Sequence, residues 1–241
     1  MLYIDINSKD AAYHFSVEEF CMRELKSEKP VLMIWQADNT VILGNNQAVA
    51  VEVKLDYARE HGIKIVRRSS GGGAIYTDMG TVLYTLIQPI VDDVIVHREE
   101  VAAAVIGVLG AMGVTAERIG KNDILVGGKK ISGLAQYTAG NFVCTHGSLL
   151  YETDLEVLSS VLVPNDDKLH PKGIKSIRSR VTNIKPYMAD DLTVSEFINC
   201  LKEGLLSGKE FLEYYINKDE QTQIVRFYNE KYANDEWTYR M

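Results

Sequence analysis

The feature that most constrains the fold of this chain is a glycine-rich turn between two short apolar segments. Residues 66–76 read Val-Arg-Arg-Ser-Ser-Gly-Gly-Gly-Ala-Ile-Tyr, which predicts a strand that ends, turns and resumes. Consecutive glycines carry no side chains, so a ligand could approach the backbone closely and meet several N–H groups. Arg67 and Arg68 precede the turn and are permanently charged donors suited to phosphate or carboxylate. The spacing matches neither a P-loop nor a dinucleotide-binding turn, and a plain hairpin tip explains it equally well.

The rest of the chain alternates between strand and helix patterns. Alternating or apolar segments predict strands at residues 2–7, 31–36, 41–43, 63–66, 74–76, 81–88, 114–118, 124–126, 129–136 and 142–151. Helical patterns are found at residues 10–26, 53–61, 97–112, 155–161, 193–206, 211–216 and 220–232. Turn residues at 78–80 and at Gly127-Gly128 predict hairpins that join segment 74–76 to 81–88 and segment 124–126 to 129–136. We therefore expect an α+β fold, in which a mixed, mainly antiparallel β-sheet is flanked by helices.

Composition narrows the setting of the protein. The chain has 241 residues, 46% of them hydrophobic, and we expect one domain over residues 1–241. The formal charge of −7 argues against a nucleic-acid partner. The first residues do not resemble a signal peptide, and the apolar runs are too short for a membrane span, so we expect no membrane partner. Three widely separated cysteines fit free thiols in a reducing compartment, and a cytoplasmic location is expected.

Positive charge nevertheless gathers in one stretch that contains few acids. Its members are Lys168, Lys172, Lys175, Arg178, Arg180 and Lys185. Such a stretch could form a local anion site on an acidic protein, although most charge runs are solvated faces. The stretch lacks periodicity and predicts a long ordered loop over residues 166–185.

A second group of polar residues surrounds the hairpin at Gly127-Gly128. Asn122 and Asp123 offer oxygens for a hard cation such as Mg²⁺. Strand alternation predicts that Lys130 shares a face with Ser132, where the lysine could act as an electrostatic clamp for a phosphate or an acyl carbonyl. Taken alone, a lysine beside a hairpin is more often an ordinary surface residue.

Two further patterns concern side chains that could be buried. Cys144 and His146 lie two apart on a predicted strand and could face one cavity, which invites a cysteine–histidine nucleophile. Nothing in the sequence indicates an activated thiol, and a lone buried cysteine is usually inert. Glu18 falls within the apolar stripe of the first helix, either as a snorkelling surface residue or as a buried acid that fixes a neighbouring loop.

Taken in order, these motifs resemble those of the lipoate–protein ligase family, in the biotin/lipoate ligase-like superfamily. The resemblance spans nearly the whole chain. It rests on Gly44-Asn45-Asn46-Gln47, Arg67-Arg68-Ser69-Ser70-Gly71-Gly72-Gly73-Ala74-Ile75-Tyr76, Lys121-Asn122-Asp123-Ile124, Lys129-Lys130-Ile131-Ser132-Gly133, His146-Gly147-Ser148-Leu149-Leu150 and the segment from Lys172 to Asn183.

The resemblance implies a biotin/lipoate ligase catalytic-domain fold and the two-step reaction of that family. Lipoate and Mg-ATP would give lipoyl-adenylate, and the lipoyl group would then pass to a lysine on a lipoyl domain of a 2-oxoacid dehydrogenase or on the glycine-cleavage H protein. Lys130 would be the catalytic residue, between the lipoyl carboxyl oxygen and the α-phosphate, and Asp123 would be the Mg²⁺ ligand. The strands around residues 31–35 and 76 would line a slot for the lipoyl tail. Nucleotide and lipoate would be bound by Arg68, Gly71, Gly72, Gly73, Ala74, Ile75, Tyr76, Asn122, Lys130 and His146.

The chain also departs from the pattern of that family. Thr77 stands where the family usually has a histidine after the glycines. The chain stops at Trp237-Thr238-Tyr239-Arg240-Met241, where ligases of this kind commonly continue into an accessory domain. The expectation is therefore a catalytic domain that lacks the accessory domain and depends on a separate accessory subunit, or a protein that performs only the transfer step.

Two other readings compete with an ATP-dependent ligase. An ATP-independent octanoyl- or lipoyl-transferase of the same fold would use a cysteine nucleophile. Residues 119–128 contain no cysteine, and Asn165 follows Pro164, so the cysteine positions of those transferases are filled by other residues here. The second alternative is a module that only binds lipoate or its adenylate.

Overall fold

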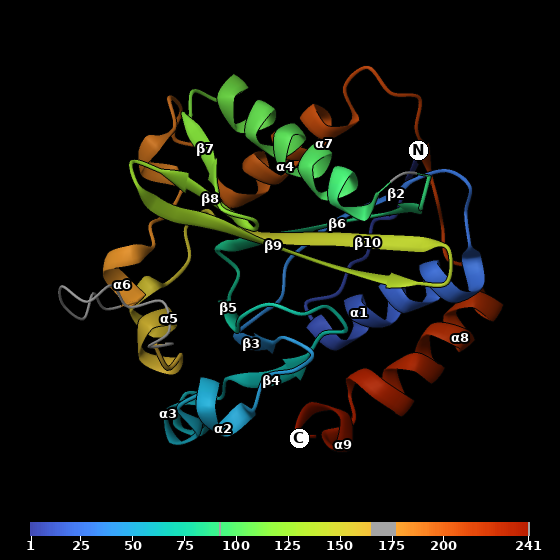
Figure 1. Ribbon diagram of the computed structural model, residues 1–241, viewed down its shortest axis with the longest axis horizontal. Coiled ribbons are helices and arrows are strands. Elements are labelled where there is room, and N and C mark those ends of the chain that lie inside the picture. Colours follow the sequence, from blue (N-terminus) through green and yellow to red (C-terminus); the bar gives the residue numbers. More distant parts are fainter. Residues whose placement is uncertain (92, 165–176, 241) are drawn as a thin grey trace.

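A computed structural model of the chain describes residues 1–91, 93–164 and 177–240. Its main feature is an eight-stranded sheet with the order β11-β1-β2-β6-β10-β9-β8-β7 (Figure 1). The strands are β1 (Leu2–Tyr3), β2 (Val31–Trp35), β6 (Thr81–Pro89), β7 (Ala116–Ile119), β8 (Asp123–Val126), β9 (Lys129–Ala139), β10 (Phe142–Leu150) and β11 (Leu212–Glu213). Antiparallel pairs join β2 through β6, β10, β9 and β8 to β7, and β1 is parallel to both of its neighbours. The predicted mixed, mainly antiparallel sheet is confirmed.

Helices cover both faces of this sheet. Helices α4 (Val94–Ala111) and α7 (Val194–Leu206) pack on one face, where a core cluster forms around Tyr84, Val105 and Phe197 (Figure 1). The opposite face is covered by α1 (Ala11–Phe20) with its π-helical continuation Cys21–Leu25 and by α8 (Lys218–Phe227). Both faces of the large sheet are therefore largely buried.

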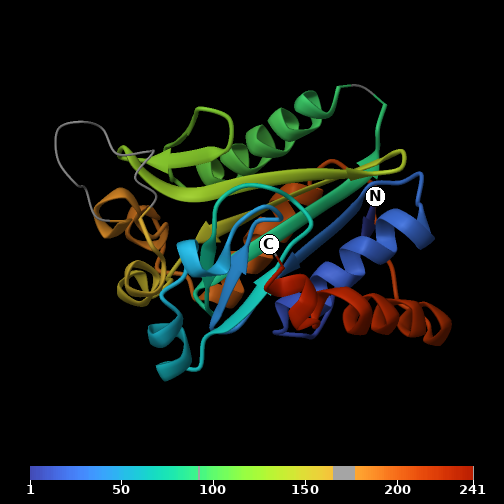
Figure 2. The same cartoon turned by 60° about the horizontal axis from the view of Figure 1, so that its bottom comes forward.

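A smaller sheet lies on that second face. It has three strands in the order β4-β3-β5, namely β3 (Thr40–Leu43), β4 (Lys64–Arg67) and β5 (Ile75–Thr77). Turning the molecule brings this sheet in front of the large one (Figure 2). The glycine-rich turn connects β4 to β5 across β3, so the turn is held at one end of the small sheet and cannot be the tip of a simple hairpin.

The remaining helices are short and lie mainly beside the small sheet. They are α2 (Val49–Glu52), α3 (Leu55–Glu60), α5 (Leu155–Val161), α6 (Ile177–Arg180) and α9 (Asp235–Thr238), with a 3₁₀ turn at Lys185–Tyr187 and a π-helical turn at Tyr228–Tyr232. A core cluster that includes Val41, Leu43 and Tyr76 from the small sheet also contains Leu158 and Val161 from α5.

Local sequence explains where the longer helices begin and end. The Thr193 side chain accepts from the Glu196 N–H, and the Glu196 carboxylate accepts from the Thr193 N–H, which is the predicted capping box at the start of α7. Helix α4 begins at Val94, three residues before the predicted start, because Asp93 accepts from the Ile95 N–H. It ends before Gly113, whose φ of +84° is the left-handed conformation that glycine adopts readily.

Two predictions about neighbouring segments are wrong. The segments at 74–76 and 81–88 do not form a hairpin, because β5 pairs with β3 in the small sheet whereas β6 pairs with β2 and β10 in the large one. Residues 211–216 are not helical, since Leu212 and Glu213 form β11 beside β1. By contrast, Gly127 and Gly128 adopt φ values of +55° and +73° between β8 and β9, as the predicted two-residue hairpin requires.

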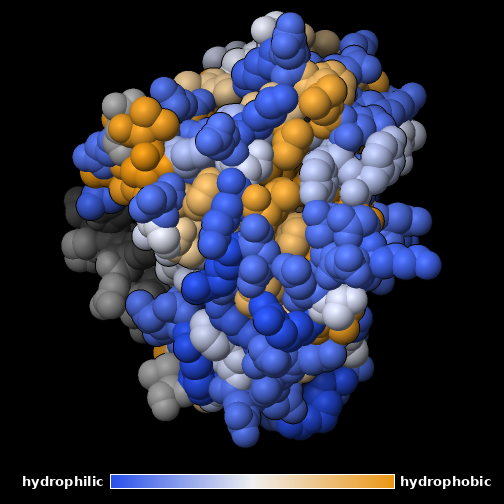
Figure 3. Space-filling model, turned by 90° about the vertical axis from the view of Figure 1, so that its right-hand side faces the viewer, coloured by the Kyte–Doolittle hydropathy of each residue, from blue (hydrophilic) through white to orange (hydrophobic). Residues whose placement is uncertain are grey.

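The surface leaves several large apolar side chains exposed. Figure 3 shows one side of the molecule, which hydrophilic residues largely cover, with apolar groups forming a band between them. Scattered exposed apolar residues are normal on a folded protein and indicate no function by themselves. Among the described residues, no helix combines the length and the apolar character needed to cross a membrane.

Candidate active site

The glycine-rich turn lies against the second face of the large sheet. Ser70 Oγ is 2.7 Å from His146 Nε2 on β10, and a Cβ placed on Gly72 would lie 3.9 Å from the Ala135 side chain on β9. His146 and Ala135 are directly paired in the sheet, so the turn covers one position of the β9–β10 ladder. The sheet, the small sheet and α1 therefore meet at this turn.

Arg68 is buried and braces the turn from inside. Its Nε donates to Ser70 Oγ at 2.9 Å, and its Nη2 donates to the carbonyl oxygens of Gly71 at 2.7 Å and Gly73 at 2.8 Å. Its Nη1 donates to the Ile42 carbonyl at 3.2 Å, which ties the turn to β3. Burial lowers the pKa of Arg68 to about 10, so the guanidinium keeps its charge at neutral pH. Arg68 thus sets the shape of the turn, and its contact with a ligand stays a prediction.

The three glycines are exposed and their backbone is free to bind. Within the described part of the chain, the N–H groups of Gly71, Gly72 and Gly73 have no protein acceptor. Gly72 has a φ of +91°, and Cβ atoms on Gly71 or Gly73 would meet nothing within 4 Å. Gly44, at the end of β3, packs so closely on the turn that a Cβ there would lie 2.1 Å from the Gly72 carbonyl oxygen. The turn is therefore a fixed row of unpaired donors at the surface, which suits an anion.

Arg67 is fully buried, and it points away from the glycines. Its Nη1 donates to the Gln47 carbonyl at 2.7 Å and the Gly44 carbonyl at 3.0 Å. On the other side, Nη2 and Nε donate to the Thr238 carbonyl at 2.6 and 2.9 Å. Trp237 returns a bond from its indole Nε1 to the Arg67 carbonyl at 2.9 Å. Arg67 thus fastens the segment around α9 to the loop that follows β3, so the first arginine of the pair is structural.

A chain of buried polar groups runs from the turn to α1. His146 Nε2 contacts Ser70, and His146 Nδ1 lies 3.0 and 3.1 Å from the two oxygens of Glu18, which is 1% exposed. Glu18 also accepts from Thr85 Oγ1 at 2.7 Å, and Thr85 in turn accepts from Trp35 Nε1 at 3.1 Å. Of the two readings of Glu18, the buried acid is confirmed.

The next residue of α1 makes a parallel connection. Glu19 accepts from the Tyr232 hydroxyl at 2.6 Å, and that hydroxyl lies 2.7 Å from Ser69 Oγ. Lys231 also donates to Glu19 at 2.7 Å, and Arg23 forms a second, short contact with it. Burial alone would raise the pKa of Glu19, but the bonds from Lys231 and Tyr232 outweigh it, and the pKa is lowered. Neither Glu19 nor Tyr232 was singled out from the sequence, because their link to the turn depends on contacts between distant segments.

Lys130 lies on the same face of the large sheet as the glycine-rich turn. It does so because of a β-bulge, which the regular alternation assumed in the prediction does not include. The β8–β9 ladder shifts register so that Ile124 pairs with Ser132 but Leu125 pairs with Lys130, which leaves Ile131 as an extra, bulged residue. The predicted shared face of Lys130 and Ser132 is therefore wrong. Lys130 Nζ instead lies 3.0 Å from the position of a Cβ on Gly133 and 2.8 Å from the Asp123 carboxylate.

Asp123 and Asn122 supply oxygens beside this lysine. The Asp123 side chain is 40% exposed, and Lys130 pairs with its Oδ1. Among the described residues, the buried Oδ1 of Asn122 has no hydrogen-bond partner. Amide and carboxylate oxygens are the ligand types that a hard cation such as Mg²⁺ prefers, and Asn122 and Asp123 supply one of each at consecutive positions. The oxygen types of these two residues thus suit Mg²⁺, and their role as its ligands stays a prediction.

The predicted sharing of a face by Cys144 and His146 is confirmed, but it does not produce a nucleophile. Cys144 is fully buried, and burial together with the nearby Glu18 carboxylate raises the pKa of its thiol well above the usual range. The donor atoms of Glu18, Cys144 and His146 lie within 4.8 Å of one another. Glu18 and His146 already bind each other, Thr85 and Ser70, so this cluster is a satisfied hydrogen-bond network, and we assign it no metal.

Some predicted binding residues lie at the margin of this arrangement. Ala74 and Ile75 follow the turn into β5, an edge strand of the small sheet. Tyr76 points its buried ring away, into the cluster with Val41 and Leu43, and its hydroxyl donates to Asn39 at 3.1 Å. Trp35 belongs to a different core cluster from Tyr76, and the slot for the lipoyl tail between their strands stays a prediction.

Only part of the basic stretch falls in the described residues. Lys168, Lys172 and Lys175 lie outside them. Arg178 pairs with Glu156 at 2.7 Å, and Lys185 pairs with Glu152 at 2.9 Å. The segment between them runs beside β9, because the Thr182 N–H donates to the Lys130 carbonyl at 3.0 Å. Arg178 and Lys185 are therefore engaged with acids.

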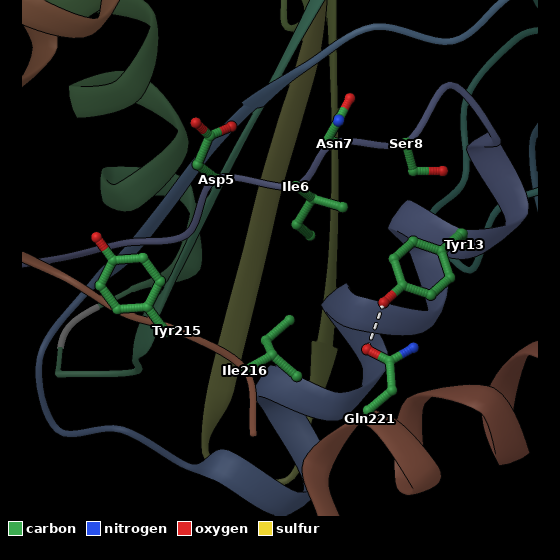
Figure 4. A pocket seen from close by; sticks show the side chains of 8 residues that line it. All are labelled: Asp5, Ile6, Asn7, Ser8, Tyr13, Tyr215, Ile216 and Gln221. Atoms are coloured by element: carbon green, nitrogen blue, oxygen red, sulfur yellow. Dashed lines mark hydrogen bonds between the residues drawn. The ribbon is translucent and has the colours of Figure 1, made fainter. Parts of the chain in front are cut away.

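Two clefts lie elsewhere on the molecule. The first, of about 410 Å³, is lined by residues 5–8, Tyr13, Tyr215, Ile216 and Gln221, and a hydrogen bond from Tyr13 to Gln221 closes one wall (Figure 4). The second, of about 480 Å³, lies between α3, β4 and residues 228–239. Neither cleft is lined by Lys130 or by the three glycines, so cleft size does not identify the site. The candidate site is identified by the free N–H groups of the turn, by Lys130 and by the Asn122–Asp123 pair.

Comparison with known proteins gives a consistent result. Residues 10–206 match the model of the family described as the lipoyl protein ligase A/B catalytic domain. The chain is 35% identical over 243 residues to the lipoate–protein ligase LplJ of Bacillus subtilis, covering 99% of this chain and 73% of that protein.

Solved structures extend the likeness to the whole fold. A structure of lipoate–protein ligase A bound with ATP superposes with a TM-score of 0.85 at 28% identity, over 99% of this chain and 97% of the other. A structure from an archaeal lipoylation system, described as a bipartite lipoate protein ligase and its E2 lipoyl domain from Thermoplasma acidophilum, has a TM-score of 0.85 at 29% identity. That match covers 99% of this chain and 95% of the other.

Proposed function

This chain belongs to the lipoyl protein ligase A/B catalytic-domain family, and we propose that it attaches lipoate to lipoyl domains in an ATP-dependent reaction. It is an enzyme of the lipoate–protein ligase type. One observation carries the proposal at the level of the site: three unpaired, exposed backbone N–H groups lie on the same sheet face as a lysine paired with an aspartate.

The reaction brings two anions together before it makes an amide. A carboxylate oxygen of lipoate attacks the α-phosphorus of ATP, the bond to the β-phosphate breaks, and pyrophosphate leaves. The amine of the acceptor lysine then attacks the acyl carbon, loses a proton, and AMP leaves. Both steps increase negative charge on oxygens held close together, so fixed donors and cations lower the barrier more than groups that must reorganise.

The chain supplies such groups from rigid elements. The N–H groups of Gly71, Gly72 and Gly73 would hold phosphate or carboxyl oxygens, and Arg68 keeps the turn in the conformation that presents them. Lys130 would lie between the acyl carboxyl oxygen and the α-phosphate and stabilise charge in both steps. The salt bridge with Asp123 holds the Lys130 side chain beside Gly133. Because Gly133 has no side chain, there is room for the Lys130 ammonium group.

Mg²⁺ is expected to accompany ATP, and Asp123 with Asn122 would hold it. Bound there, the ion would neutralise phosphate charge during the first step. His146 contributes through Ser70, and Ala74, Ile75 and Tyr76 would contribute backbone atoms of the β5 edge.

The acceptor and a second subunit are further parts of the proposal. The archaeal lipoylation system is described as a bipartite lipoate protein ligase and its E2 lipoyl domain, which supports lipoyl domains as the macromolecular partner. A subunit 1 of lipoate–protein ligase A from the same organism is 33% identical to this chain, over 87% of this chain and 84% of that protein. We therefore propose that a separate accessory subunit could assist the first step.

Intact-mass spectrometry of an apo lipoyl domain tests this function. One tube contains this protein, lipoate, ATP and Mg²⁺, and a second contains the protein with synthetic lipoyl-adenylate. A gain of one lipoyl group in both tubes would establish a self-sufficient ligase, and a gain only with the adenylate would establish the transfer step and the need for a partner. No gain in either tube would refute the proposal.

An ATP-independent acyl-transferase is the rival that the site disfavours. Such an enzyme needs an accessible thiolate at the site. Cys144 and Cys21 are buried, and burial raises the pKa of both thiols. The partly exposed Cys200 lies in α7, on the face of the large sheet opposite the glycine-rich turn.

A further inference from the structure

Two consecutive acids of α1 reach two consecutive serines of the glycine-rich turn. Glu18 is connected to Ser70 through His146, and Glu19 is connected to Ser69 through Tyr232. Each connection has one intermediate side chain, and every member is at least partly buried. Ser69 Oγ also donates directly to Glu19 Oε2, over a longer distance of 3.5 Å. The intermediates come from different parts of the chain, His146 from β10 and Tyr232 from the turn that follows α8.

The chemistry of the groups fixes the direction of the first connection. Arg68 Nε can only donate, so Ser70 Oγ accepts from it at 2.9 Å and keeps its own proton to give. Both oxygens of Glu18 face His146 Nδ1, which therefore carries the imidazole proton. Because Nδ1 carries the proton, we assign Nε2 as the acceptor of the Ser70 hydroxyl. This arrangement joins the buried Arg68 to the buried Glu18 through Ser70 and His146.

The second connection is fixed in the same way. The Tyr232 hydroxyl lies 2.6 Å from Glu19 Oε2 and gives its only proton to that carboxylate. Its oxygen can then only accept from Ser69, whose Oγ lies 2.7 Å away. Lys231 and Arg23 form ion pairs with Glu19. These pairs favour the ionised carboxylate, which keeps its hydrogen bond from Tyr232.

We propose that Glu18 and Glu19 are positioning residues that set the conformation of the glycine-rich turn through Ser70 and Ser69. Neither carboxylate reaches the exposed glycines, so both act through the serines. The inference rests on the proposed function, because it assigns these acids to the placement of the backbone donors that serve the reaction. A displacement of about 1 Å at such donors can cost on the order of 100-fold in rate.

A double-mutant cycle with Glu18→Gln and Ser70→Ala tests the first connection. The readout is kcat/KM for transfer from synthetic lipoyl-adenylate, which requires neither ATP nor an accessory subunit. If Glu18 acts through Ser70, Glu18→Gln should cost about tenfold in the wild-type background and less than about twofold in the Ser70→Ala background. Equal costs in both backgrounds would overturn the connection.

A tyrosine pair tests the second connection with less risk of unfolding. Tyr232→Phe removes the hydroxyl between Glu19 and Ser69, and Tyr214→Phe is the matched control, since Tyr214 donates to Glu220 at 2.5 Å and has no contact with the turn. We expect Tyr232→Phe to lower kcat/KM about tenfold and Tyr214→Phe to leave it within about twofold. Equal effects of the two variants would overturn the role of Glu19.

The proton positions can be observed without any turnover. In protein labelled with ¹⁵N-histidine and assigned with a His146→Gln variant, His146 should show a protonated Nδ1 and an unprotonated Nε2, and Glu18→Gln should shift this signal. A protonated Nε2 in the wild-type protein would overturn the proposed chain. A wild-type protein that fails to transfer lipoate would refute the proposed function, and the nitrogen signals would still decide the hydrogen-bond chain.

Discussion

A Cβ on Gly44 would lie 2.1 Å from the carbonyl oxygen of Gly72. The end of β3 and the glycine-rich turn are thus in backbone contact, and the absence of one side chain permits it. Arg68 donates to the carbonyls of Gly71 and Gly73, on either side of Gly72 in the sequence. These two hydrogen bonds fix the position of the Gly72 carbonyl.

Substitution Gly44→Ala should therefore displace the turn. We expect a loss of about 1–3 kcal/mol in the free energy of unfolding, because backbone atoms must move, and a drop in lipoyl transfer. Gly107→Ala is the control, since this glycine lies in α4 with open space around its Cβ position and should stabilise the protein by about 0.5–1 kcal/mol. Urea unfolding and the mass assay measure both quantities, and an undiminished stability of the Gly44 variant would contradict the close contact.

Lys130→Ala should remove transfer without unfolding the protein. A lost electrostatic contact in the transition state costs about 10²–10³-fold in rate, whereas a half-exposed pair such as Lys130–Asp123 contributes roughly 0–1 kcal/mol to stability. The neighbouring exposed Lys129→Ala is the control and should behave as wild type in both respects. Unimpaired transfer by the Lys130 variant would refute the role of this lysine.

Cys144→Ser should remain active. The thiol is buried beside Glu18 and its raised pKa keeps it protonated, so it does not serve as a nucleophile. The serine hydroxyl can use the same polar neighbours. Transfer rates and thermal unfolding of the variant are the measurements, and loss of turnover in a folded variant would support the thiol mechanism instead.

Stability should fall on acidification below the ordinary histidine pKa because of His14. Burial lowers the pKa of His14 below its usual 6.5, and its ring stacks on Trp35 with centroids 4.3 Å apart. Above pH 6.5 the residue is neutral in both folded and unfolded states. As the pH falls below 6.5 the unfolded chain takes up the proton first, so the free energy of unfolding decreases until the folded pKa is reached.

The variant His14→Gln should show a shallower decrease over that range. Urea unfolding at a series of pH values from neutral to about 5 compares the two proteins. An identical slope for both would show that another group causes the acid sensitivity.

Arg67→Lys should destabilise the protein although it keeps the charge. The guanidinium serves carbonyls on two sides, Gln47 and Thr238 among them, and an ammonium group cannot span both. Hydrogen bonds from a charged donor contribute about 1.5–3 kcal/mol each, so we expect a loss of roughly 3 kcal/mol. Arg59→Lys, at an exposed pair with Asp56, should change stability by less than about 0.5 kcal/mol. A similar loss in both variants would refute the structural role of Arg67.

Local sequence predicted much of the fold and the main candidates of the site. The turn chemistry of residues 66–76, the hairpin at Gly127-Gly128 and the capping box at Thr193 are set by near neighbours, so each appears in the sequence. Glu18 fell in an apolar stripe, which allowed both a snorkelling surface residue and a buried acid, and the three-dimensional contacts decide for the buried acid. The strand pairing of β5 could not be predicted, because its partner β3 was chosen by packing between two sheets and not by the short turn that leads to β6.

The partners of the turn were also beyond local reasoning. Tyr232 lies 163 residues from Ser69, and His146 lies 76 residues from Ser70. A sequence shows the residue types but not which of them meet. Arg67 is the last residue of β4 and Arg68 follows it with its N–H still bonded to the Leu43 carbonyl of β3, so the two side chains turn to opposite sides and take different tasks.

The bulge at Ile131 selects between two adjacent lysines. In a regular strand of the same residues, Lys129 and Ile131 would turn toward Gly133 and the site, and Lys130 would turn toward the core beneath α4. One unpaired residue reverses this choice. If β9 were grafted into another scaffold, the bulge in its pairing with β8 would have to be transferred with it. The same sequence in a regular strand would place Lys129 in the site in place of Lys130.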